Sequence, residues 1–158
     1  MDQESDYFLT TFNKIDNNLY LGGLLGASNP TLISRHHITS IVSLLSPNAV
    51  LNKHRNLSYL ELCIDDLPNQ NIMRVVPEAL VFIISEIKRG GNVLIHCAAG
   101  VSRSASVAVA YFMVTYDLDY SAALAKVKKG RKCACPNPGF ERQLRNMNIQ
   151  SLKQFINK

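Results

Sequence analysis

The segment CAAGVSRS, residues 97–104, places a nucleophile and several anion-binding groups within eight consecutive positions. Cys97 follows the apolar run NVLIH, which is typical of a buried strand, and a helical pattern begins six or seven residues later. The turn between them contains small residues, and a glycine at position 100 can adopt the positive φ that a tight curl needs. We therefore expect the six backbone N–H groups of residues 98–103 to surround one point, as a cradle for an anion such as phosphate.

Two side chains would complete this loop. Arg103 can donate two parallel hydrogen bonds to phosphate oxygens, a geometry that lysine does not offer. Cys97 would lie at the centre of the cradle, where a helix N-terminus and a nearby cation stabilise the thiolate form of a cysteine. A thiolate beneath the phosphorus of a bound phosphate monoester is placed for in-line attack, which would give a cysteinyl-phosphate.

The elements that must hold this loop are those of one α/β domain. Apolar, β-branched runs predict strands, and the patterns between them predict helices that dominate the second half of the chain. Strands are expected at residues 18–23, 38–45, 57–64 and 92–96, and helices at 29–37, 76–91, 102–116, 120–130 and 137–156. This alternation predicts a single domain with a mostly parallel central sheet flanked by helices. A ligand site is then expected at the C-terminal ends of the strands.

Composition excludes several classes of protein. The chain has 158 residues, of which 47% are hydrophobic and 18% charged, and no apolar run reaches the ~18–20 residues that cross a bilayer. The start, MDQESDYF, is too acidic and polar for a secretory signal. We therefore expect a cytoplasmic protein, with the nucleus as a second location, whose four cysteines are free thiols. The net charge of +5 is concentrated in the last third of the chain, which suits anionic partners or a solvated face.

The chain also resembles a known family. HCAAGVSRS, residues 96–104, matches the signature H-C-x-x-G-x-x-R-S of the cysteine-dependent protein tyrosine phosphatase superfamily. LYLGG, IDDLPNQNI and CPNPGFERQL are similar to segments of the small, atypical dual specificity phosphatases, and the resemblance spans roughly residues 15–149. It implies a protein tyrosine phosphatase-like fold, with an N-terminal segment at 1–14 and a catalytic domain at 15–158.

The resemblance also implies roles for individual residues. The Ser104 hydroxyl would donate to the Cys97 sulfur and help it leave, and His96 would orient the turn and help hold the thiolate. The catalytic residues implied are Cys97, Arg103, Asp66 and Ser104. The substrate-binding residues implied are His96, Ala98, Ala99, Gly100, Val101, Ser102 and Arg103.

A carboxylic acid must protonate the leaving oxygen. Asp65 and Asp66 are the candidates, because they follow an expected strand and precede Pro68. The resemblance favours Asp66, but Asp65 stays open, and either carboxylate could instead cap the turn formed by DDLPN. Asp117 and Asp119 are interpreted as turn and helix-cap residues.

The remaining cysteines give weaker signals. Cys133 and Cys135 form a CAC pair that lacks the two-residue spacing of zinc sites, so we expect neither a metal nor a cofactor. Cys63 lies on the expected strand 57–64, which leads to Asp65 and Asp66. Because some relatives of this kind protect an oxidised nucleophile with a disulfide, a Cys63–Cys97 link is a hypothesis.

The resemblance predicts hydrolysis of phosphotyrosine and of phosphoserine and phosphothreonine, since the chain lacks room for the extra loop of tyrosine-specific relatives. The loop contains no lysine, which argues against inositol lipids. The expected partners are phosphorylated proteins, with no stable nucleic-acid complex, no membrane span and no predicted oligomeric state. The alternatives are an RNA 5′-phosphatase, a phosphate-binding module without turnover, which belongs to another class of protein, and a rhodanese-like sulfur transferase.

Overall fold

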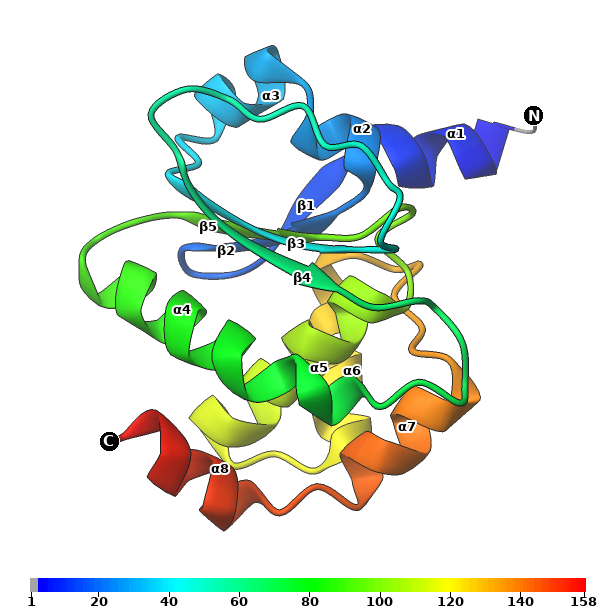
Figure 1. The fold of residues 1–158 in the computed structure, drawn as a ribbon, viewed down its shortest axis with the longest axis vertical. Helices are drawn as coiled ribbons and strands as arrows, with labels where there is room; N and C mark the ends of the chain where they lie inside the picture. Colours follow the sequence, from blue (N-terminus) through cyan, green and yellow to red (C-terminus); the bar gives the residue numbers. More distant parts are fainter. Residues whose placement is uncertain (1–2) are drawn as a thin grey trace.

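A five-stranded sheet forms the centre of the molecule (Figure 1). The structure is a computed structural model that describes residues 3–158, with side chains from residue 6. The strands are β1 (Phe12–Asp16), β2 (Leu19–Gly22), β3 (Ser40–Leu45), β4 (Ser58–Cys63) and β5 (Val93–His96). Their order is β1-β2-β5-β3-β4, with β1 antiparallel to β2 and the other neighbours parallel. The predicted single-domain α/β fold with a mostly parallel sheet is confirmed.

Helices lie on both faces of this sheet (Figure 1). One face carries α1 (Gln3–Thr10), α2 (Leu24–Ala27) and α3 (Pro30–Arg35). The other carries α4 (Val76–Lys88), preceded by the short 3-10 helix η1 (Ile72–Arg74), α5 (Arg103–Tyr116), α6 (Tyr120–Gly130), α7 (Pro138–Arg145) and α8 (Ile149–Ile156). Over the described residues, no helix combines the length and apolar character that crossing a membrane requires.

Strand β5 is apolar throughout because both of its faces are covered. Leu94 packs into the smaller hydrophobic cluster beneath α2 and α3, whereas Val93 and Ile95 pack into the larger cluster against α4, α5 and α6. Successive side chains of a strand point to opposite faces, so a strand with two buried faces needs a continuous apolar run. The run NVLIH is therefore explained by the position of β5 between β2 and β3.

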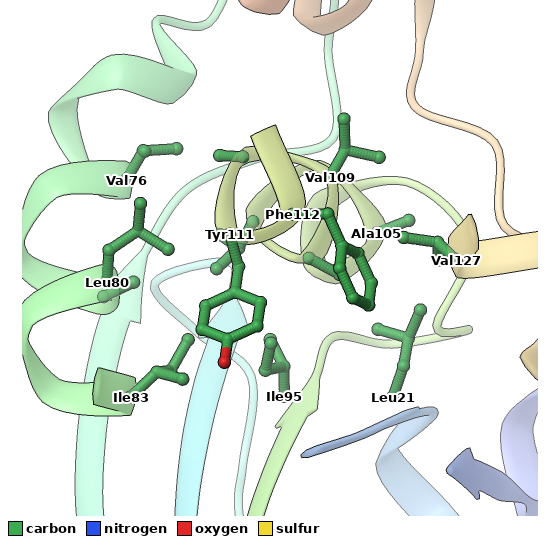
Figure 2. Packing of buried hydrophobic residues seen from close by; sticks show 14 of the residues in the cluster. Leu21, Val76, Leu80, Ile83, Ile95, Ala105, Val109, Tyr111, Phe112 and Val127 are labelled. Carbon is green, nitrogen blue, oxygen red and sulfur yellow. The ribbon is translucent and has the colours of Figure 1, made fainter. Parts of the chain in front are cut away.

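Helix α5 is buried on all sides over most of its length. Figure 2 shows it between Val76, Leu80 and Ile83 of α4 and Val127 of α6, with Leu21 and Ile95 of the sheet beneath. A helix enclosed in this way cannot shift without disturbing close-packed neighbours. The N-terminus of α5, where the loop after β5 ends, is therefore a rigid platform.

Most of the expected elements are present, but the prediction of one helix over residues 137–156 is wrong. The helix ends at Arg145, and α8 begins at Ile149. The cause is Asn148, whose side chain accepts a hydrogen bond from Ser151 N–H and so caps a new helix. The sequence patterns also gave no indication of α1, β1 or α2.

Candidate active site

The loop between β5 and α5 brings the predicted nucleophile and its serine together. Cys97 is 2% exposed, and its Sγ lies 3.0 Å from Oγ of Ser104 in the first turn of α5. Gly100 has φ +67°, and a Cβ at that position would lie 2.5 Å from the Gly22 backbone. Both the conformation and the close approach therefore require glycine there.

The carbonyl groups of this loop all point outwards. Each of the six carbonyls of residues 97–102 accepts a hydrogen bond from a donor outside the turn. The donors are the His96 ring to Cys97, Leu24 N–H to Ala98, the Arg131 guanidinium to both Ala99 and Gly100, Cys135 N–H to Val101, and Ser106 to Ser102. A planar trans peptide puts the next N–H opposite its carbonyl, so the N–H groups of residues 98–103 face inwards. The anion cradle expected from the sequence stays a prediction, which this geometry supports.

Arg103 lies at the edge of this cradle and is 8% exposed. Its Nη1 donates to the Ile64 carbonyl at 3.0 Å and to Ser46 Oγ at 3.3 Å. Ser46 and Ile64 directly follow β3 and β4, so the ends of two neighbouring strands position the guanidinium. Its Nε is buried without a hydrogen-bond partner among the described residues. A buried cationic donor without an acceptor fits an oxyanion ligand.

His96 holds the loop from beneath. Its Nδ1 lies 3.0 Å from the Cys97 carbonyl oxygen, and its Nε2 lies 2.6 Å from Ser43 Oγ. Because a carbonyl can only accept, we assign the proton to Nδ1, and the Ser43 hydroxyl then donates to Nε2. Burial lowers the pKa of His96 to about 4, so the ring is neutral at physiological pH.

Asn137 connects Asp66 to the cradle. Its Nδ2 donates to Asp66 Oδ1 at 2.9 Å, and its backbone N–H donates to Ser102 Oγ at 2.9 Å. Ser102 belongs to the cradle loop, so one residue joins the exposed Asp66 carboxylate to that loop. Among the described residues, no comparable bridge links the half-buried Asp65 to the cradle. The geometry thus favours Asp66 over Asp65 as the group that meets the substrate.

Helix α7 also contacts the rest of the loop that follows β4 and carries Asp66. Gln143 donates through Nε2 to the Gln70 carbonyl at 2.8 Å and accepts through Oε1 from Ile72 N–H at 2.7 Å. A Cβ on Gly139 would lie only 2.0 Å from the Pro68 carbonyl oxygen, so the helix and the loop are in close contact. The segment that carries Asp66 is therefore held against α7 at three places.

Comparison with known proteins identifies the family. Residues 19–150 match the family model described as "Dual specificity phosphatase, catalytic domain". The chain belongs to the dual specificity phosphatase family. It is 37% identical over 143 residues to dual specificity protein phosphatase 22-B of Danio rerio, which covers 90% of this chain and 77% of that relative.

Two further similarities support this membership. Dual specificity protein phosphatase 15 of Rattus norvegicus is 38% identical over 147 residues, which covers 90% of this chain but 61% of that relative. The crystal structure of DUSP15 has a TM-score of 0.86 at 30% identity and covers 94% of this chain and 96% of that chain. The dual specificity phosphatase fold therefore extends over nearly all of the described residues.

Several residues of this dual specificity phosphatase site were not predicted from the sequence. They are Ser43, Ser46 and Arg131, together with the contact of Asn137 to Asp66. Asn137 was expected only to cap a helix, which it also does by accepting from Phe140 N–H. The missed contacts join positions between 31 and 123 residues apart in the chain. Local sequence patterns contain no signal for such pairs.

The three other cysteines of the described residues are also free thiols. Cys63 is exposed at the end of β4, and β3 separates that strand from β5. Two strand spacings amount to about 10 Å, which is too far for a direct bond, so the hypothetical link to Cys97 would require movement of the backbone. Cys133 is half-buried and Cys135 is exposed. Across residues 3–158, no three side chains of metal-binding type are grouped closely enough to hold a metal ion.

Proposed function

We propose that this chain is a phosphatase that hydrolyses phosphotyrosine, phosphoserine and phosphothreonine in proteins through Cys97. The observation that carries the proposal is the loop that begins at Cys97, whose carbonyls all accept hydrogen bonds from outside it and whose Arg103 has a buried Nε without a partner among the described residues. Such a loop presents inward N–H groups and a cation to an incoming phosphate. The membership of the dual specificity phosphatase family supports the same substrates.

The first step would form a covalent intermediate. The N–H groups of residues 98–103 and the Arg103 guanidinium would bind the three outer phosphate oxygens. The Cys97 thiolate would then attack phosphorus in line with the leaving oxygen, so that a sulfur–phosphorus bond forms as the phosphorus–oxygen bond breaks. Asp66 would give its proton to the leaving oxygen of the serine, threonine or tyrosine side chain.

The second step would release the phosphate. The Asp66 carboxylate, now ionised, would take a proton from a water molecule that attacks the phosphorus. The sulfur–phosphorus bond would break, and Cys97 would leave as a thiolate that receives a hydrogen bond from the Ser104 hydroxyl, 3.0 Å away. The products are inorganic phosphate and the free enzyme, in which Asp66 is again protonated.

The names of the similar proteins favour phosphorylated proteins over an RNA 5′-phosphate as substrate. Turnover is favoured over phosphate binding alone, because the chain has Cys97 and Arg103 in one loop and a carboxylate, Asp66, that Asn137 links to Ser102 of that loop. A cytoplasmic location, with the nucleus as a second option, is part of the proposal. A catalytic domain over residues 15–158 also stays a prediction, although β1 begins at Phe12 and pairs with β2.

The deciding experiment is hydrolysis of p-nitrophenyl phosphate by the wild type and by Cys97→Ser, with EDTA, between pH 5 and 8. We expect turnover by the wild type and none by the serine variant, which should still bind phosphate. Peptides that carry phosphotyrosine, phosphothreonine or phosphoserine, and an RNA with a 5′-phosphate, would then give the substrate range. Binding of phosphate without turnover by the reduced wild type would instead identify a binding module.

A further inference from the structure

We propose that Arg131 is a positioning residue that holds the phosphate cradle in shape and couples it to the N-terminal helix α1. The inference rests on the proposed function, because it concerns the affinity of the same cradle for phosphate. Arg131 is not part of the family signature, and its side chain lies outside the loop, behind the carbonyls. Its role would be to set the direction of the N–H groups without touching the substrate.

The guanidinium of Arg131 is a buried cation without a carboxylate partner. The residue is 1% exposed and forms no ion pair within the described part of the chain. Burial of an unpaired charge is costly, so such a group is expected only where hydrogen bonds satisfy it. The acceptors are the carbonyls of Gly100 (2.9 Å from Nε), Ala99 (2.9 Å from Nη2), Phe8 (2.8 Å from Nη2) and Thr11 (3.4 Å from Nη1), with Asn13 Oδ1 (2.8 Å) and Thr11 Oγ1 (3.2 Å) also on Nη1.

On the cradle side, Arg131 controls two consecutive peptide planes. Its Nε and Nη2 hold the carbonyls of Gly100 and Ala99, and these planes carry the N–H groups of Val101 and Gly100 into the cradle. The other four carbonyls of the loop have donors of their own. Loss of the guanidinium would therefore free the tightest part of the turn and leave the rest in place.

On its other side, Arg131 binds the C-terminal end of α1. The last carbonyls of a helix lack partners within it and carry partial negative charge, so a cation there is favourable. The same helix end lies against the turn after β2, where a Cβ on Gly23 would come within 2.3 Å of the Phe8 carbonyl oxygen. Figure 1 shows α1 next to α2 at this end of the sheet.

The consequence is a coupling between helix docking and phosphate binding. One rigid, planar group satisfies the end of α1 with one part of its fork and the cradle with the other. If α1 were displaced, the guanidinium would lose its acceptors on that side and would no longer be fixed against Ala99 and Gly100. By linkage, a phosphate bound in the cradle would also favour the docked helix.

Adjacent threonines at the end of α1 provide a matched test. The hydroxyls of Thr10 and Thr11 each donate to the carbonyl four residues earlier, but only Thr11 Oγ1 also accepts from Arg131. Thr11→Val therefore removes an Arg131 acceptor, and Thr10→Val is the control. The full chain is used, with Arg131→Lys as a third variant, because lysine lacks the planar fork.

Two readouts separate positioning from folding. The first is the inhibition constant of inorganic phosphate against p-nitrophenyl phosphate, with kcat and KM measured separately. The second is the ratio of the alkylation rates of Cys97 by iodoacetate and by iodoacetamide, since only iodoacetate carries an anion for the cradle to bind. We expect Thr11→Val to weaken phosphate binding about threefold to tenfold and to lower that ratio, whereas Arg131→Lys loses about tenfold or more. Thr10→Val should stay within about twofold of the wild type.

The outcomes are distinguishable. A wild type that neither binds phosphate nor turns over substrate overturns the proposed function, and the coupling with it. An active wild type whose Thr11→Val variant matches Thr10→Val in both readouts overturns the coupling alone. A Thr11→Val protein that melts earlier but keeps the alkylation ratio also overturns it, because the contact would then be structural only. If Arg131→Lys does not fold, the comparison of Thr11→Val with Thr10→Val tests the coupling by itself.

Discussion

The side chains of the proposed site divide into those that would face a bound phosphate and those that hold the loop from outside. Cys97 and Arg103 belong to the first group, and His96 and Arg131 to the second. The division follows from the peptide plane, because an inward N–H requires an outward carbonyl that must itself be satisfied. We therefore expect the outer residues to affect phosphate binding although none of them would touch the substrate.

At the residue scale, the assignment of the acid can be tested with two isosteric variants. Asp66→Asn removes the proton donor but keeps an oxygen that can accept from Asn137 Nδ2. We expect kcat with poor leaving groups such as phenyl phosphate to fall about 100-fold or more, since general acid catalysis contributes about 10²–10⁴-fold. Substrates with acidic leaving groups need little protonation and should be affected much less.

Asp65→Asn is the matched control and should change both rates less than about threefold. A reversal of the two results would assign the acid to Asp65. Equal, small effects of both variants would show that neither carboxylate protonates the leaving group.

At the element scale, α7 holds the loop that follows β4 and carries Asp66. Its N-cap Asn137 binds Asp66, its first turn contacts Pro68, and its Gln143 binds both Gln70 and Ile72. The position of Asp66, the proposed acid, is thus held by a helix more than 60 residues later in the chain. The IDDLPNQNI and CPNPGFERQL segments are therefore in direct contact in the fold.

The contacts of α7 with the loop of Asp66 predict different effects on kcat for two similar N-cap substitutions. Asn137→Ser and Asn148→Ser both replace an asparagine N-cap with another good cap, so each should change the free energy of unfolding by less than about 1 kcal/mol. Only Asn137→Ser loses the amide that holds Asp66. We expect it alone to lower kcat for phenyl phosphate, by about threefold to tenfold, as measured beside urea unfolding. Equal kinetics of the two variants would show that α7 does not position the acid.

The elements also show which features of this protein could be predicted from its sequence. The buried run of β5, the small-residue turn and Gly100 have local causes, so the loop and its nucleophile could be identified. Arg131 could not, since its acceptor Thr11 lies 120 residues away and only the folded chain brings them together. The break before α8 could not be predicted from the helical pattern of residues 137–156, because a single cap residue, Asn148, starts the new helix.

At the scale of the whole molecule, the site and the stability of the fold share one titratable group. His96 is fully buried at the end of β5, and its neutral ring bridges Ser43 of β3 to the Cys97 carbonyl. Protonation would place a charge in this interior and remove the acceptor that the Ser43 hydroxyl uses. Acid should therefore destabilise the whole fold through the same residue that holds the catalytic loop.

The size of this effect follows from the pKa of His96, which burial lowers from 6.5 to about 4. Between these values the unfolded chain binds a proton that the folded protein does not, so the free energy of unfolding decreases as the pH falls from about 6.5 towards 4. The contribution of His96 lost between pH 7 and pH 4.5 is roughly 2–3 kcal/mol.

Urea unfolding at the two pH values should show this loss in the wild type and in a control variant, His37→Asn. That variant replaces an exposed histidine at a positive φ that asparagine tolerates. In His96→Asn, an amide can still donate to the Cys97 carbonyl but cannot titrate, so the acid-induced loss should be smaller by that amount. If His96→Asn and His37→Asn lost the same stability, the fold would not depend on a neutral His96, and acid sensitivity would have to come from the carboxylates instead.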